Sequence, residues 1–138
     1  MSESVQPPYN PKAFARGSKN YGEVYTQRIL DRLNSIDPEF SQLFQAFVYG
    51  GMYDRDVIDH KTRELCAVAA LTVAGYFPQL RAHFQACRNY GATDEEIREV
   101  VLQMAVYGGM AASLTALDEF ERFRKAESPV LGFGDPGK

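Results

Sequence analysis

Apolar side chains recur along most of this chain at the spacing of one face of an α-helix, and the breaks between these stretches predict six helices. The first helix is expected over about residues 21–34. The second begins at Asp37, a residue type that caps helix N-termini, followed by Pro38, and it ends at Gly50 and Gly51. No stretch alternates with period two, so the pattern predicts an all-α fold without a sheet.

The third predicted helix follows a polar connector at residues 52–59. It contains a run, residues 65–75, that has no charge and a single hydroxyl, that of Thr72. A helix without a polar face cannot present one side to water, so we expect it to be buried on most sides. A six-helix domain of this size encloses few such positions, and part of this surface is therefore expected to meet another copy of the chain in a homo-oligomer.

Three more helices are expected toward the C-terminus. The fourth covers residues 78–90 and stops at Gly91, which tolerates the left-handed conformation of a C-terminal cap. The fifth starts at a capping box formed by Thr93 and Glu96, and the sixth covers residues 110–125.

The length of 138 residues and the apolar content of 45% fit one domain, expected over residues 21–126. Residues 1–20 hold three prolines and many polar residues, so we expect a flexible N-terminal arm there. Residues 127–138, rich in glycine and proline, are expected to form an irregular C-terminal tail.

The composition of the chain excludes several kinds of binding partner and of cysteine site. The 18 acidic and 15 basic residues give a net charge of -3 and are mixed without a basic block, which argues against nucleic acid. No apolar run reaches the roughly 18 residues of a membrane span, and the first residues do not resemble a signal peptide, so no membrane partner and a cytoplasmic location are expected. Cys66 and Cys87 are too few and too far apart for a disulfide scaffold, a redox pair or a zinc site, and are expected to be small buried hydrophobes in a reducing compartment.

The chain has two histidines. His60 lies beside Asp59 at the start of a helix, where a solvated capping role is expected. His83 lies on a mainly apolar helix, either as a core histidine that donates to a backbone carbonyl or as part of a site. Glu64 favours a site, because it adjoins the uncharged run on the preceding helix.

A short turn joins the helices of Glu64 and His83, so they should run antiparallel, with the two residues one to two helical turns apart in height. Two long side chains can close that gap and form a general acid/base pair. Glu64 is alternatively a first-turn acid that favours its helix N-terminus. Gln79 shares the His83 face and Tyr76 lies one turn earlier, so these residues can line one cavity, whereas Arg81 points to the opposite side.

The residues above belong to a longer pattern, in which four stretches stand out: Lys61-Thr62-Arg63-Glu64-Leu65, Leu80-Arg81-Ala82-His83, Asn89-Tyr90-Gly91-Ala92-Thr93-Asp94-Glu95-Glu96-Ile97-Arg98-Glu99-Val100 and Gln103-Met104-Ala105-Val106-Tyr107-Gly108-Gly109. Their order and spacing resemble the carboxymuconolactone decarboxylase family, within the alkyl hydroperoxidase D-like superfamily. The likeness covers about residues 47–120.

The resemblance implies an all-helical subunit that assembles as a trimer or hexamer. It also implies a decarboxylase of aromatic-acid catabolism that acts on a small carboxylated lactone, 4-carboxymuconolactone, or on a related keto acid. The lactone carbonyl is the electron sink for this reaction, so no metal or cofactor is required. His83 is then the expected acid or oxyanion donor and Glu64 its partner, with Tyr76, Gln79 and Tyr107 as substrate-binding residues.

The sequence departs from the family pattern in two places. Decarboxylases of the family usually read Gly-Glu-x-Trp where this chain has Met52 in place of the acid, and Pro-Ala-Ala-Asn where it has Leu114 in place of the amide. These changes suggest a less polar substrate, or a non-catalytic relative that binds a small acid or a partner protein. In the alkyl hydroperoxidase branch, two cysteines occupy the positions of Tyr76 and Gln79, so thiol-dependent peroxide reduction is the least favoured alternative.

Overall fold

The computed structural model describes residues 9–126 of the chain, and every regular element in that part is a helix, which confirms the all-α prediction. The elements in chain order are α1 (Pro11–Tyr21), α2 (Glu23–Ile36), α3 (Pro38–Phe44), the π-helix η1 (Gln45–Tyr49), the 3-10 helix η2 (Met52–Asp54), α4 (His60–Ala74), α5 (Phe77–Asn89), α6 (Asp94–Gly108) and α7 (Met110–Lys125). Within the described range there are thus seven α-helices, one more than the six expected. Among these elements, none combines the length and apolar character that crossing a membrane requires.

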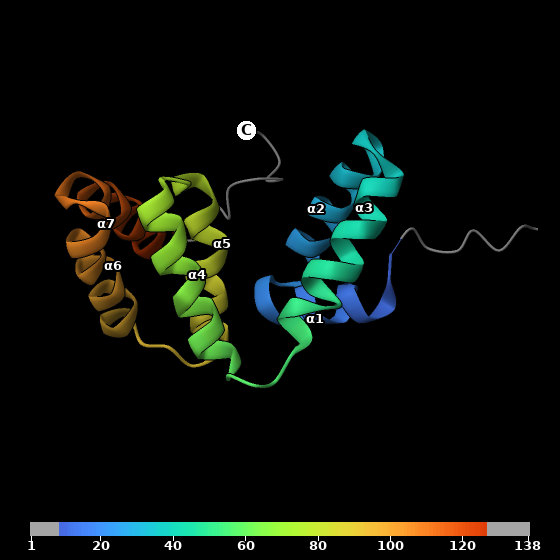
Figure 1. Ribbon diagram of the computed structural model, residues 1–138, viewed down its shortest axis with the longest axis horizontal. Coiled ribbons are helices and arrows are strands. Elements are labelled where there is room, and N and C mark those ends of the chain that lie inside the picture. Colours follow the sequence, from blue (N-terminus) through green and yellow to red (C-terminus); the bar gives the residue numbers. More distant parts are fainter. Residues whose placement is uncertain (1–8, 127–138) are drawn as a thin grey trace, which may run out of the picture. The chain divides into compact units, whose positions relative to one another are not determined.

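The chain divides into two compact units, Met1–Val57 and Ile58–Lys138, whereas the sequence led us to expect one domain over residues 21–126. The polar stretch before α4 is the connection between them rather than a loop within a single core. In the N-terminal unit α1 and α3 both pack on α2, and the C-terminal unit holds α4 to α7 (Figure 1). Each unit has buried aromatic side chains of its own.

The N-terminal part of the chain differs from the flexible arm that we expected, because α1 occupies residues 11–21. Asn10 caps this helix: its side-chain oxygen accepts from the backbone amides of Lys12 and Ala13, and Pro11 fits the first turn. The buried residues of α1 are Ala13, Gly17, Asn20 and Tyr21, so Tyr21 at the end of the helix is the only large one. The remaining part of the expected arm, residues 1–8, and the expected tail, residues 127–138, lie outside the described residues.

The helix that begins at Pro38 has its capping residue as predicted, since the Asp37 side chain accepts from the amide of Phe40. Its buried side differs from the apolar stripe seen in the sequence. Ser41, Gln45 and Tyr49 are buried, and the side chains at Phe40, Leu43 and Phe47 are exposed.

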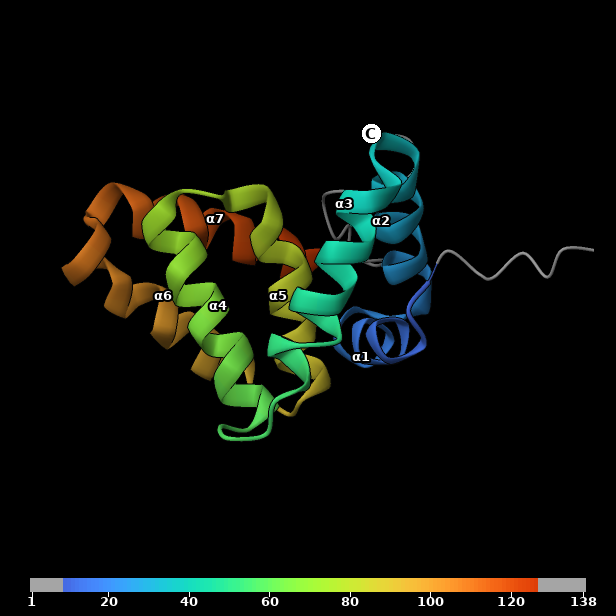
Figure 2. The same cartoon turned by 45° about the vertical axis from the view of Figure 1, so that its right-hand side comes forward.

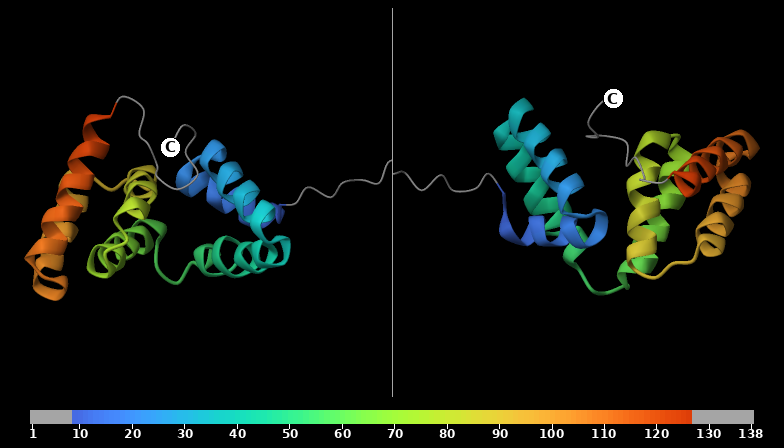
Figure 3. Two further views of the ribbon diagram at one scale, coloured as in Figure 1. Left: turned by 90° about the horizontal axis from the view of Figure 1, so that it is seen from above. Right: turned by 180° about the vertical axis from the view of Figure 1, so that it is seen from behind.

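The C-terminal unit consists of two helical hairpins, α4–α5 and α6–α7 (Figures 2 and 3). Their core contains a cluster of three aromatic rings, in which Phe84 of α5 lies 4.9 Å from Phe120 and 5.6 Å from Phe123 of α7, between ring centroids. α4 and α6 approach closely at Gly108, where an added Cβ would lie 3.1 Å from the Val73 Cα.

Local signals set the ends of these helices. Asp59 caps α4, and Gly75, with φ of 80°, ends it at the predicted turn. Thr93 and Glu96 form the expected capping box of α6, and α7 has the expected bounds.

The third predicted helix, α4, is less buried than expected. Glu64, Val68 and Thr72 form its buried line, whereas Cys66 and Val73 are exposed. The exposed side is apolar, because small and aliphatic residues occupy it. Burial within this chain therefore does not explain why residues 65–74 of α4 carry no charge.

Candidate functional site

Glu64 and His83 meet between the two helices of the first hairpin in the C-terminal unit. The His83 Nδ1 lies 2.7 Å from the Glu64 Oε2. An ionised carboxylate only accepts hydrogen bonds, so the Nδ1–H of the imidazole donates to it. The predicted pair is thus present in the structure, and His83 donates to a side chain rather than to the backbone carbonyl of the alternative interpretation.

The two members of the pair differ in their access to water. The side chain of Glu64 is 1% exposed, whereas that of His83 is 17% exposed. Glu64 is the fifth residue of α4, beyond its first turn, which does not fit the alternative of a first-turn acid that favours the helix N-terminus. The arrangement holds a carboxylate behind an imidazole whose ring reaches the surface.

Ion pairs fix α5, the helix of His83, against its neighbours. Arg81 Nε donates to Glu119 Oε2 of α7 at 2.9 Å, on the side of α5 opposite to His83, as predicted. Arg88 Nε donates to Asp94 Oδ1 at 2.8 Å, and this hydrogen bond holds the pKa of Asp94 below its ordinary value of 3.8. These contacts limit rotation of α5 and so help to keep His83 facing α4.

The predicted substrate-binding residues are not enclosed by this chain. Tyr76 is 61% exposed and Tyr107 is 70% exposed, and Gln79 is exposed as well. Tyr76 is the residue before α5 and Tyr107 lies near the end of α6. The structure of the single chain therefore brings Glu64 and His83 together but does not build a closed cavity from the other three.

The second histidine has a different environment from the one expected. Asp59, not His60, caps α4, and the His60 ring stacks on Tyr90 at a centroid distance of 5.1 Å. This stack joins the start of α4 to the residue that follows α5 and fixes the register of the hairpin. Little in the sequence indicates this ring stack, because neither His60 nor Tyr90 belongs to an apolar stripe.

The two cysteines also differ from each other. Cys87 is fully buried, as predicted, whereas Cys66 is exposed, so that prediction is wrong for Cys66. Burial, and next the negative charge of Glu64, raise the pKa of the Cys87 thiol. Cys87 stays a neutral thiol beside the pair at physiological pH, and sequence reasoning had not connected it with Glu64.

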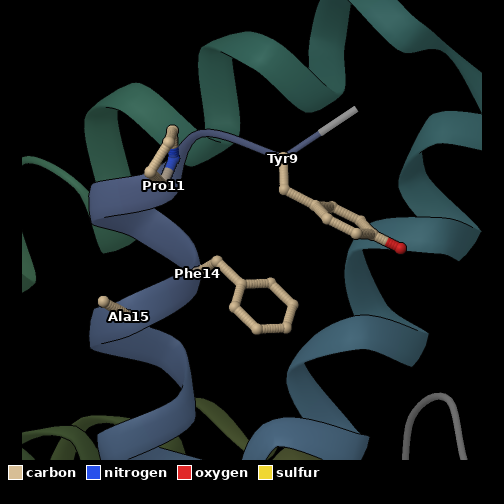
Figure 4. Close-up of a pocket in the computed structure, with 4 residues that line it drawn as sticks. All are labelled: Tyr9, Pro11, Phe14 and Ala15. Carbon is tan, nitrogen blue, oxygen red and sulfur yellow. The ribbon is translucent and has the colours of Figure 1, made fainter. Parts of the chain in front are cut away.

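Within residues 9–126 no three or more His, Cys, Asp and Glu side chains are grouped so that they could hold a metal ion. An apolar pocket of about 300 Å³ is lined by Tyr9, Pro11, Phe14 and Ala15 (Figure 4). These residues all belong to the N-terminal unit, and none of them is a predicted site residue.

Comparison with known proteins places these residues in a family. A model of the carboxymuconolactone decarboxylase family matches residues 38–122, which include both Glu64 and His83. The 4-carboxymuconolactone decarboxylase of Acinetobacter baylyi is 33% identical over 104 residues, which cover 75% of this chain and 78% of that protein.

Two further relatives are more distant. The nitrosuccinic acid decarboxylase of Metarhizium robertsii is 27% identical over 96 residues, 70% of this chain and 67% of that protein. Peroxisomal protein 2 of Schizosaccharomyces pombe is 28% identical over 124 residues, 76% of this chain and 57% of that protein. The family model matches more than half of the chain, and Glu64 and His83, which lie within the matched residues, are in contact. The chain therefore belongs to the carboxymuconolactone decarboxylase family.

Proposed function

We propose that this protein is a decarboxylase of small organic acids, with His83 as its acid and Glu64 as the partner of His83. The observation that carries the proposal is the contact of 2.7 Å between a buried carboxylate and an imidazole that reaches the surface. The carboxylate orients the ring, so that its other nitrogen faces away from Glu64 and can deliver a proton.

The reaction needs two things from the protein. The bond between the leaving carboxylate and its carbon breaks, carbon dioxide departs, and the electron pair moves into a conjugated acceptor on the substrate. A donor is needed for the oxygen of that acceptor, and a proton for the carbon that receives the electrons. Because Glu64 engages Nδ1, we assign both tasks to the other ring nitrogen of His83, Nε2.

The names of two relatives support this class of substrate. One relative acts on 4-carboxymuconolactone and the other on nitrosuccinic acid, according to their names. In the first compound an unsaturated lactone can accept the electron pair, and in the second a nitro group can. We infer that this protein also takes an acid whose leaving carboxylate is bonded to a carbon next to such an acceptor, a carboxylated lactone or a keto acid, and that it needs no cofactor because the acceptor stores the electrons.

A second candidate function is binding without catalysis, of a small acid or a partner protein. Met52 and Leu114 favour it, because they replace an acid and an amide of the usual family pattern, and both are largely exposed apolar side chains. Peroxide reduction by thiols has less support, since Tyr76 and Gln79 replace the two cysteines and burial keeps Cys87 protonated.

We further propose that the protein works as a homo-oligomer, a trimer or hexamer, in the cytoplasm. Residues 65–80 and 100–117 contain no charge, and they include the α4–α5 and α6–α7 turns at one end of the C-terminal unit (Figure 2). Seven large apolar side chains are exposed on these two stretches: Val73, Tyr76, Leu102, Val106, Tyr107, Met110 and Leu114. A surface of this kind favours contact with another copy, which would also shield Tyr76 and Tyr107. Two unpaired cysteines fit a reducing compartment.

Turnover of purified protein tests the proposal. The protein is incubated with 4-carboxymuconolactone and a panel of conjugated lactone and keto acids, and released carbon dioxide is measured. We expect His83→Ala to lower kcat by about 100-fold or more and Glu64→Gln by about 10-fold or more. His60→Ala is the matched control, because it removes the other histidine and should leave turnover intact.

Each alternative gives a different result. Turnover that survives both substitutions at the pair would remove His83 and Glu64 from the mechanism. Binding of these acids without any release of carbon dioxide would favour the second candidate function. The mass of the protein in solution tests the oligomer, and a monomer at micromolar concentration would contradict it.

A further inference from the structure

Cys87 occupies a particular position on α5. It follows His83 by four residues, so the two side chains share one face of the helix. At 3.6 residues per turn Cys87 lies about 40° from His83 and about 60° from Phe84, between the two. Phe84 faces the aromatic core and His83 faces α4, which places Cys87 on the core side of the pair.

The register of the hairpin places Cys87 across from Glu64. The His60 ring stacks on Tyr90, which fixes the two ends of the hairpin against each other. Glu64 lies four residues after His60 on α4, and Cys87 lies three residues before Tyr90. Glu64 and Cys87 are therefore at nearly the same height along the hairpin. The effect of the Glu64 charge on the pKa of the Cys87 thiol agrees with this proximity.

We propose that Cys87 is a positioning residue, which seals the protein side of the Glu64 carboxylate and directs that carboxylate toward His83. Its importance for turnover depends on the function proposed above, whereas its effect on the hydrogen bond does not. The residue type suits the task. A thiol is a weak hydrogen-bond donor and packs as a small hydrophobe, so it fills the space without competing for the carboxylate.

A hydroxyl at the same position would act differently. Serine is close in shape to cysteine but is a strong donor, so Cys87→Ser would offer the Glu64 carboxylate a competing hydrogen bond and weaken its hold on the imidazole. Alanine offers no donor but leaves space, so Cys87→Ala should keep the hydrogen bond and admit water behind it. Cys66→Ser makes the same chemical change at the exposed cysteine and is the matched control.

Nuclear magnetic resonance of protein labelled with ¹⁵N-histidine reads the hydrogen bond directly. In the unmodified protein we expect a resolved Nδ1–H proton for His83. In Cys87→Ser this resonance should shift or broaden, and kcat should fall about 10-fold with KM changed less than about twofold, the size expected when a reacting group is misplaced. In Cys87→Ala the chemical shift should stay and the proton should exchange faster with water. Cys66→Ser should match the unmodified protein in all three measurements.

The outcomes separate this proposal from the proposed function. A Cys87→Ser protein with an unchanged Nδ1–H resonance would overturn the positioning role, whatever its turnover. If no protein of the set releases carbon dioxide, the decarboxylase proposal fails, and the resonance still decides the role of Cys87. If Cys87→Ser does not fold, Cys87→Ala decides, and an exchange rate equal to that of the unmodified protein would overturn the proposal.

Discussion

Replacing His83 by alanine should destabilise the C-terminal unit, because it leaves the Glu64 carboxylate inside the protein without the imidazole. Breaking a buried ion pair by removing one partner costs about 3–5 kcal/mol. The side chain of His83 is 17% exposed, so water can enter the space that the ring leaves and hydrate part of the carboxylate. We therefore expect the lower end of the range, about 3 kcal/mol, which is a factor of about 140 in the unfolding equilibrium constant.

Urea unfolding followed by far-ultraviolet circular dichroism measures this change, and it suits a chain without tryptophan. The control is His60→Ala, which loses a ring stack and should cost at most about 1.5 kcal/mol. A double-mutant cycle with Glu64→Gln isolates the pair, and we expect a coupling energy of about 1–3 kcal/mol. If His83→Ala costs less than about 0.5 kcal/mol, the carboxylate does not depend on the imidazole and our account of the site is wrong.

Three other predictions concern packing, pH and thiol reactivity. An added Cβ at Gly17 would lie 2.6 Å from the Thr26 Cγ2, so Gly17→Ala should lower the free energy of unfolding in urea by about 1–3 kcal/mol. The loss should be smaller in a Thr26→Ser background, which lacks this methyl group. An equal loss in both backgrounds would contradict the packing. The hydrogen bond from Arg88 lowers the pKa of Asp94, so the stability that this carboxylate contributes is present at neutral pH and is lost as the pH falls below 3.8. Urea unfolding curves of Asp94→Asn and of the unmodified protein should therefore differ at pH 7 and converge in acid. A thiol reagent should modify Cys66 in the native protein and Cys87 only after denaturation, and rapid labelling of both in the native state would show that Cys87 is not buried.

The parts of the fold that sequence could predict are those set by local chemistry. The capping residues Asp37 and Thr93 start helices where they were expected, because each satisfies backbone amides within three residues of itself. The contact of Glu64 with His83 was also predictable, since a short turn fixes the relative height of residues on two adjacent helices. These are short-range relations, and they require no knowledge of the remaining chain.

The parts that sequence could not predict depend on packing between elements. The helix α1 escaped detection because three of its four buried residues, Ala13, Gly17 and Asn20, are too small or too polar to mark an apolar stripe. Phe40 and Phe47 marked a stripe that the chain does not bury. In the site, Cys87 looked like an ordinary core residue, because its relation to Glu64 depends on a hairpin register that a ring stack sets.

The stability of the N-terminal unit depends, through the side-chain amide of Gln45, on where the chain is truncated. Its Oε1 accepts from the backbone amide of Asn10 at 2.6 Å, and its Nε2 donates to Ser41 Oγ at 3.1 Å, all within a fully buried side chain. Truncation beyond Asn10 would leave a buried acceptor without that donor, at a cost of about 1–3 kcal/mol. An expression variant should therefore keep its affinity tag or protease site upstream of this contact.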